Sequence, residues 1–213
     1  YYSMYQGFLF TMLIALSTNN LGVLWVSIEG ATLATVLLVS LYRTRESIEA
    51  GWKYFIICGV GISQALFGTI LVYFAAAKTI PGKNEGLLWP VFQEHASQMD
   101  SGVMALAFVF LLVGYGTKVG LVPLHNWLPD AHAEGPTPIS AVLSGLLLNV
   151  AMYAVVRCKI LVEGTLQSPL PSRMLMGFGL LSVVLASFLL WRQRDIKRLF
   201  ASSSIEPLSL IHI

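Results

Sequence analysis

Two ionisable residues, Glu29 and Lys118, lie inside otherwise uncharged stretches of this sequence. Placing one such charge at the centre of a bilayer costs about 2.5–3.5 kcal/mol on insertion scales, so something must compensate it. If both side chains face one interior cavity, each favours the charged form of the other while desolvation opposes both. Such a pair can take up and release protons, and function is the default interpretation. The alternatives are a structural ion pair or hydrogen-bonded acid for Glu29, and snorkelling of Lys118 towards an interface.

Two histidines follow the lysine, at positions seven residues apart. His125 and His132 can share a helix face, and imidazole titrates near neutral pH, which suits proton relay. The alternative is that both, together with Asp130, only form hydrogen bonds in their loop. A metal site is not expected, because no further ligand stands nearby at metal-site spacing.

Other chemical motifs are missing from the sequence. It contains no glycine-rich nucleotide loop, GxSxG or CxxC pattern. We therefore expect no catalytic residue and no cofactor in this chain. Cys58 and Cys158 lie beside or inside apolar runs and are expected to serve packing.

The composition is that of a membrane protein. Of 213 residues, 56% are hydrophobic and 11% charged, against roughly 25% charged in soluble domains. The net charge of +2 is weak and scattered, so nucleic-acid binding is not expected. The sequence begins and ends within apolar stretches. We expect an internal fragment, 1–213, that forms one transmembrane domain in the lipid bilayer.

Windows of about 20 apolar residues predict membrane-spanning helices, since they are too long and continuous for barrel strands. The fold class is therefore all-α, an integral-membrane helical bundle. The spans are predicted at about 4–18, 21–42, 54–77, 101–122, 138–160 and 174–191, with another starting after 198. The loops 43–53, 122–136 and 192–198 carry more Lys and Arg than the opposite loops, which favours them weakly as cytoplasmic.

The fourth span is predicted to be broken and to continue to about 132. Gly116 and Gly120 form a small-x-x-x-small pair, and Pro123 removes a backbone donor. Unpaired backbone in a membrane is tolerated only in protein or beside a cavity, so we expect a hydrated pocket from Lys118 past His125, closed by Trp127. Thr137 is expected to cap the next helix, with Pro138 at its first position.

These residues resemble a known family. The run TKVGLVPLHNWLPDAH at 117–132, followed by GPTPISA at 135–141, is similar to the signature of proton-conducting antiporter-like membrane subunits. Such subunits occur in respiratory complex I, Mrp-type antiporters and membrane-bound hydrogenases. WVSIEGATL at 25–33 and QRDIKRLFASSSI at 193–205 agree in order. The stretch 19–35, with 41–44 and 52–55, most resembles the hydrogenase-4 component F branch.

The resemblance implies that Glu29 and Lys118 are the essential acid and base of proton translocation. It also implies two inverted five-helix repeats, of which this chain holds the first and the start of the second. Two departures stand out. Asn149 occupies the centre of the fifth span, where a lysine or histidine is usual, so a full relay there needs water. The family also does not continue as Glu206-Pro207 does after Ile205.

The predicted function is a proton-translocating subunit in the inner, or plasma, membrane. Other membrane subunits of a respiratory or hydrogenase complex are its expected partners and perform the redox chemistry. Two alternatives are an Mrp-type cation/proton antiporter without a redox partner and a helical scaffold with degenerate ionisable sites.

Overall fold

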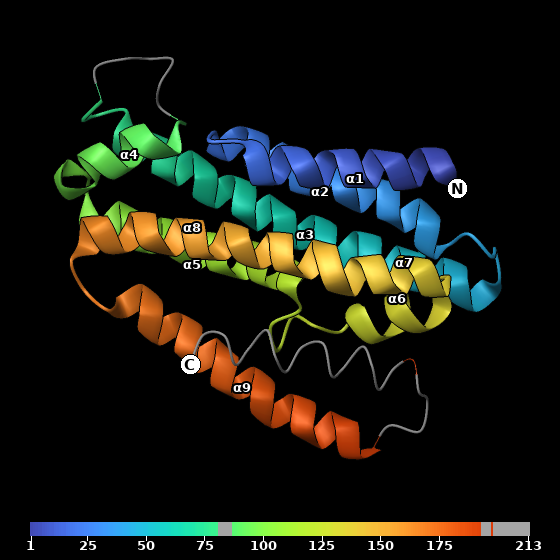
Figure 1. The fold of residues 1–213 in the computed structure, drawn as a ribbon. Coiled ribbons are helices and arrows are strands. Elements are labelled where there is room, and N and C mark those ends of the chain that lie inside the picture. The colour runs from blue at the N-terminus through green and yellow to red at the C-terminus, as the bar shows by residue number, and fades with distance from the viewer. Residues whose placement is uncertain (81–86, 193–196, 198–213) are drawn as a thin grey trace.

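The computed structural model describes residues 1–80, 87–192 and 197. In this part of the chain the long helices lie side by side, with short helices at both ends of the bundle (Figure 1). Five segments are long and apolar enough to cross a membrane: Leu21–Val39, Arg45–Ala76, Ser101–Val119, Thr137–Leu166 and Leu170–Leu189. The all-α membrane fold expected from the sequence is confirmed. The expected span after 198 lies outside the described residues.

The helices follow one another closely along the chain. Their bounds are α1 Tyr2–Ser17, α2 Leu21–Val39, α3 Arg45–Ala76, α4 Trp89–His95, η1 Ala96–Gln98, α5 Ser101–Val119, α6 Leu128–Glu134, α7 Thr137–Val142, η2 Leu143–Leu147, α8 Leu148–Leu166 and α9 Leu170–Arg192. The η2 segment is a single stretch of π-helix, so α7, η2 and α8 form one continuous span.

Side-chain caps fix where three helices begin. Asn20 Oδ1 accepts hydrogen bonds from two backbone N–H groups of α2, and Asp100 Oδ1 does the same for α5. Thr44 Oγ1 accepts from Ser47 N at 3.1 Å. Because this cap lies ahead of a polar stretch, α3 begins nine residues before the start of the apolar window at Tyr54.

The expected cap of α7 is wrong by one residue. Pro136 is the cap, because it is extended (φ −55°, ψ 141°) and its carbonyl accepts the first helical hydrogen bonds, from Ile139 N and Ser140 N. Thr137 is therefore already helical, and Pro138 occupies the second helical position. A proline there costs nothing, since the N–H groups of the first turn have no helical partner.

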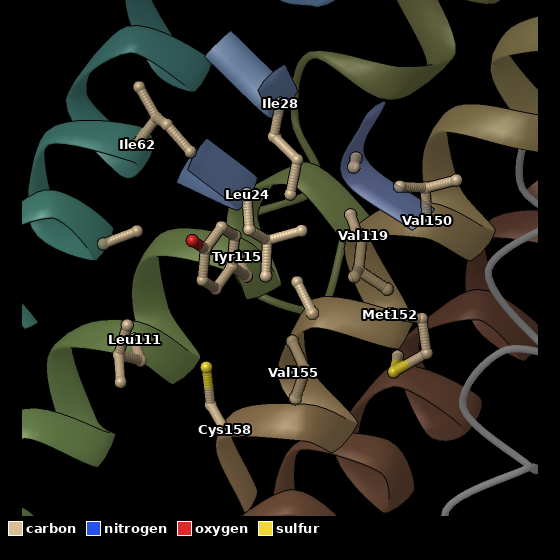
Figure 2. Packing of buried hydrophobic residues seen from close by; sticks show 14 of the residues in the cluster. Leu24, Ile28, Ile62, Leu111, Tyr115, Val119, Val150, Met152, Val155 and Cys158 are labelled. Atoms are coloured by element: carbon tan, nitrogen blue, oxygen red, sulfur yellow. The ribbon is translucent and has the colours of Figure 1, made fainter. Parts of the chain in front are cut away.

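Glycines bring α3 and α5 into close contact. A Cβ on Gly114 would lie 2.5 Å from Ala65 N, and one on Gly61 would lie 2.6 Å from Thr117 Cβ. Small residues that permit such an approach are typical of helix pairs in membranes. Around this crossing, side chains from α2, α3, α5 and α8 surround Tyr115 (Figure 2). Cys58 and Cys158 are both buried and unpaired, as packing requires.

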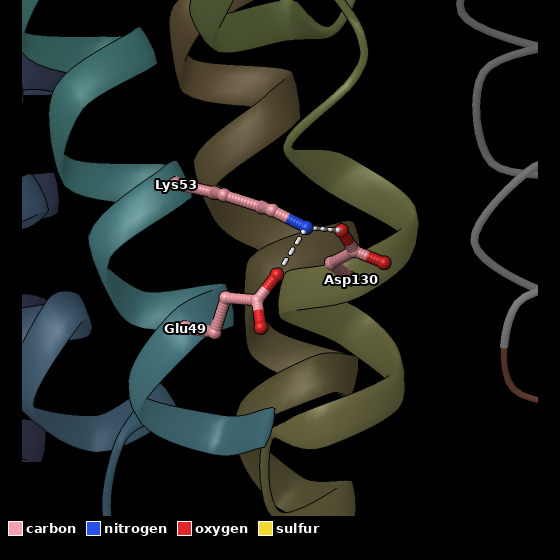
Figure 3. Close-up of polar contacts among 3 residues, drawn as sticks. All are labelled: Glu49, Lys53 and Asp130. Atoms are coloured by element: carbon pink, nitrogen blue, oxygen red, sulfur yellow. Dashed lines mark hydrogen bonds and ion pairs between the residues drawn. The ribbon is translucent and has the colours of Figure 1, made fainter. Parts of the chain in front are cut away.

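Polar contacts tie the two ends of the bundle. At one end Lys53 of α3 binds Glu49 at 2.8 Å and Asp130 of α6 at 3.2 Å (Figure 3). At the other end Arg157 of α8 donates to Thr18 O at 2.6 Å and lies 5.0 Å from the Trp89 ring. These contacts hold α6, α4 and the α1–α2 connection against the long helices.

We expect Gly114→Ala to destabilise the protein by about 1–3 kcal/mol, because the added methyl group overpacks the α3–α5 crossing. Gly59→Ala is the matched control on α3, since a Cβ there meets nothing within 4 Å. Thermal unfolding of the full-length protein in detergent measures both. Equal melting temperatures would show that the crossing is not as close as the structure has it.

Candidate functional site

The interruption after α5 is made by Gly120. Its φ of 79° lies in the left-handed region that glycine adopts readily. Gly120 N donates to Thr117 O at 3.2 Å and Leu121 N to Gly116 O at 2.9 Å, the pattern of a helix end with a left-handed residue. Of the three residues expected to break the helix, Gly116 stays helical and Pro123 lies in the loop beyond the end.

Side chains satisfy the backbone groups that the interruption frees. Trp127 is fully buried, and its Nε1 donates to Thr117 O at 2.8 Å. Val122 N donates to Ser182 Oγ of α9 at 3.0 Å. Val119 and Val122 are 1% exposed. Direct hydrogen bonds and packed side chains therefore occupy positions where the sequence predicts a hydrated pocket, whereas Asn126 is exposed.

Lys118, in the last turn of α5, has no exposed surface. Its ammonium group donates hydrogen bonds to Thr32 Oγ1 of α2 and, at 3.4 Å, to Tyr54 OH of α3. The Nζ atom also lies 4.8 Å from the centroid of the Tyr54 ring, an arrangement that attracts a cation. Side chains of three helices, α2, α3 and α5, thus meet at this charge. Because Lys118 is fully buried, its side chain does not snorkel to an interface.

Glu29 stands one helical turn before Thr32 on α2. Its Oε2 atom is buried and has no hydrogen-bond partner. Glu29 and Lys118 interact electrostatically, yet among the described residues the ion pairs within 4.0 Å do not include this one. The structure thus brings the two residues to one interior region without a direct ion pair.

The histidines lie apart from this cluster. His132, on α6, is buried and its Nε2 has no partner; burial lowers its pKa to about 4. His125, in the loop before α6, is half-buried, and burial lowers its pKa as well. Within the described part of the chain, the hydrogen bonds of Lys118 reach neither imidazole.

Asn149 faces away from the lysine. Its side chain is exposed on α8, and Nδ2 donates to Gly145 O at 2.7 Å, across the π-helical turn. The structure therefore does not bring Asn149 together with Lys118. The described residues contain no cluster of three His, Cys, Asp or Glu side chains that could hold a metal ion.

The hydroxyl groups of the site are not among the residues predicted from the sequence. Thr32 and Thr35 follow Glu29 at intervals of three residues, which places all three on one side of α2. That spacing could have indicated a row of polar side chains beside Glu29. No such pattern indicated Tyr54, because its contact with Lys118 joins residues 64 positions apart.

Comparison with known proteins assigns the fold and sequence to a family. The profile of the NADH:quinone oxidoreductase/Mrp antiporter transmembrane family matches residues 18–213. The chain belongs to this family. The matched residues include the whole region from Glu29 to Lys118.

Curated relatives of the chain come from two branches of the family. It is 57% identical over 211 residues to a protein of Methylacidiphilum infernorum called hydrogenase-4 component F homolog, covering 99% of this chain and 44% of that protein. It is 33% identical over 218 residues to NADH-quinone oxidoreductase subunit N of Bacillus anthracis, covering 96% of this chain and 41% of that one. The chain thus spans less than half the length of these relatives.

Solved structures of membrane complexes share the fold. An archaeal membrane-bound sulfane sulfur reductase has a chain that is 26% identical, with a TM-score of 0.89 over 98% of this chain and 41% of that one. A chain of respiratory complex I from Thermus thermophilus is also 26% identical, with a TM-score of 0.81 over 98% and 43%. The Mrp complex of Dietzia, at 22% identity and a TM-score of 0.85 over 100% and 22%, shares the fold alone.

The buried His132 predicts a pH-dependent stability. Its folded pKa of about 4 lies below the ordinary 6.5, so between these values the unfolded chain takes up a proton that the folded chain does not. Stability is therefore lost as the pH falls from 6.5 towards 4, by about 2 kcal/mol at pH 5. We expect His132→Gln to flatten the fall in melting temperature between pH 7 and pH 5. Asn126→Gln, at an exposed site, is the control, and identical slopes in all three proteins would contradict the assignment.

Proposed function

We propose that this chain is the ion-translocating core of a membrane subunit that moves protons through Glu29 and Lys118. In this proposal the subunit binds no redox cofactor of its own and is assembled with membrane subunits of a hydrogenase-4 or NADH–quinone oxidoreductase type complex. The resident membrane is the cell inner, or plasma, membrane.

The observation that carries the proposal is the full burial of the Lys118 ammonium group where α5 ends. A lysine amine, unlike an arginine guanidinium, exchanges its proton readily when its surroundings change. The hydrogen-bond acceptors around it are neutral, and its nearest described carboxylate, Glu29, acts on it only through space. These neutral acceptors thus stabilise the charged form of Lys118 without fixing it in a permanent ion pair.

The two groups exchange protons in a coupled manner. When Glu29 gains a proton, its attraction for the ammonium group is lost, and a cation in a region of low dielectric then favours release of its own proton. When Glu29 loses the proton again, Lys118 is recharged. Redox chemistry in a partner subunit drives this cycle by changing the charge or hydration on one side of the pair.

The relatives support the redox-driven version. They include a hydrogenase-4 component F homolog and NADH-quinone oxidoreductase subunit N. The likeness to the Mrp complex is a likeness of fold, so it supplies no separate argument for an antiporter that works without a redox partner. A purely structural scaffold is the other alternative, and substitution of the charged pair separates it from the proposal.

In the full-length protein, we expect Glu29→Gln and Lys118→Ala each to lower proton uptake at least about tenfold, because each removes one of the two proton-exchanging groups. The measurement is redox-driven proton uptake into inverted membrane vesicles at matched amounts of assembled complex.

Lys159→Ala is the matched control, since it removes a lysine with the same charge from a partly exposed ion pair with Glu163 of the same helix. It should pump at the wild-type rate. Wild-type proton uptake by both site variants would leave only the scaffold interpretation.

A further inference from the structure

The hydrogen bonds around Lys118 have a fixed direction. The Thr32 hydroxyl carries one proton, which is donated within α2, to Ile28 O at 3.1 Å or to the Glu29 carboxylate, with which Thr32 also forms a side-chain hydrogen bond. The Thr32 hydroxyl oxygen therefore accepts the hydrogen bond from Lys118, because an ammonium group donates protons and has no lone pair with which to accept one. Thr32 is thus an acceptor for Lys118 and cannot be its proton donor.

The hydrogen bond between Thr35 and Tyr54 can also be given a direction. The Thr35 hydroxyl lies 2.7 Å from Ala31 O and 2.8 Å from Tyr54 OH. Because the two carbonyls beside it, Ala31 O and Thr32 O, can only accept, the assignment that satisfies every contact has Thr35 donating to a carbonyl and Tyr54 donating to Thr35. The phenol group of Tyr54 thus donates its proton to Thr35 of α2, and its oxygen accepts a hydrogen bond from Lys118.

The hydroxyl protons of Thr32, Thr35 and Tyr54 are therefore directed to groups of α2, and the oxygens of Thr32 and Tyr54 accept hydrogen bonds from the lysine. A row of groups in this orientation stabilises a cation and passes no proton without reversing at least one bond. The Tyr54 ring face adds a further attraction for the cation.

We propose that Thr32 and Tyr54, supported by Thr35, form a seat that holds charged Lys118 apart from Glu29 and so sets how readily the two groups exchange a proton. These three are positioning residues, and the inference rests on the proposed function of Lys118. Without the Thr32 hydroxyl the ammonium group loses its α2 acceptor, and the unpartnered Oε2 of Glu29 one turn away becomes its best remaining acceptor.

A zero-length cross-link reports this position directly. Dicyclohexylcarbodiimide takes up one proton and activates the Glu29 carboxylate as an O-acylisourea; Lys118, once it has lost its ammonium proton, attacks the carbonyl carbon, an amide forms, and dicyclohexylurea leaves with the carboxyl oxygen. Only an amine in contact with the carboxyl group completes the reaction, so the yield of the 29–118 amide, measured by peptide mass spectrometry, reports how often the two groups meet.

In the full-length protein we expect Thr32→Val to raise the cross-link yield at least about threefold and to lower redox-driven proton uptake about tenfold, in line with loss of a hydrogen bond to a charged group. Thr32→Ser restores the hydroxyl and should match the wild type in both measurements. Tyr54→Phe keeps the ring and loses the longer hydrogen bond, so it should raise the yield about twofold. Thr165→Val, at a buried threonine whose hydroxyl bonds its own helix at 3.4 Å, is the control and should change neither value.

The outcomes separate this inference from the proposed function. An unchanged cross-link yield in both Thr32→Val and Tyr54→Phe overturns the seat, even if Glu29→Gln abolishes proton uptake. A raised yield in these variants, absent from Thr32→Ser and Thr165→Val, supports the seat even if Glu29→Gln pumps normally and the proposed function fails.

Discussion

A fully buried ammonium group is the constraint on which the rest of this structure depends. Lipid offers no acceptor to a cation, so the protein must supply acceptors from its own helices. Lys118 finds them on α2 and α3, and this fixes how closely α5 must approach both. The glycines of the α3–α5 crossing, above all Gly61 and Gly114, allow that approach.

The end of α5 is linked mechanically to this cluster. Trp127, which donates to Thr117 O in the last turn of α5, packs against Tyr54 with ring centroids 4.7 Å apart and the two rings tilted by 38°. The same segment leads into α6, which Lys53 ties to α3 through Asp130. A continuous series of contacts therefore runs from Lys118 through Tyr54 and Trp127 to α6 at the end of the bundle.

Local patterns in the sequence were enough to predict the five long apolar helices between Leu21 and Leu189 and the interruption at Gly120, since both depend on residues near one another in the chain. The span predicted at 4–18 is not among these five. Partners from distant segments could not be predicted. Trp127 and Ser182 fill the places assigned to water, and Tyr54 binds a lysine 64 positions away. The role of Asn149 on the proton path stays a prediction; its side chain is exposed on α8 and bonds the preceding turn of its own helix. One-residue shifts of a helix start, as at Pro136, depend on backbone geometry that composition does not encode.

The central claim is that Lys118 carries a proton that it gives up and regains, and is not merely a fixed positive charge. Lys118→Arg tests this most directly, because arginine keeps the charge at the same position but does not release its proton at physiological pH. Redox turnover and proton uptake should be measured together in vesicles that contain the assembled complex. The account predicts that the variant assembles and pumps almost no protons. Proton uptake at the wild-type ratio to redox turnover would contradict it.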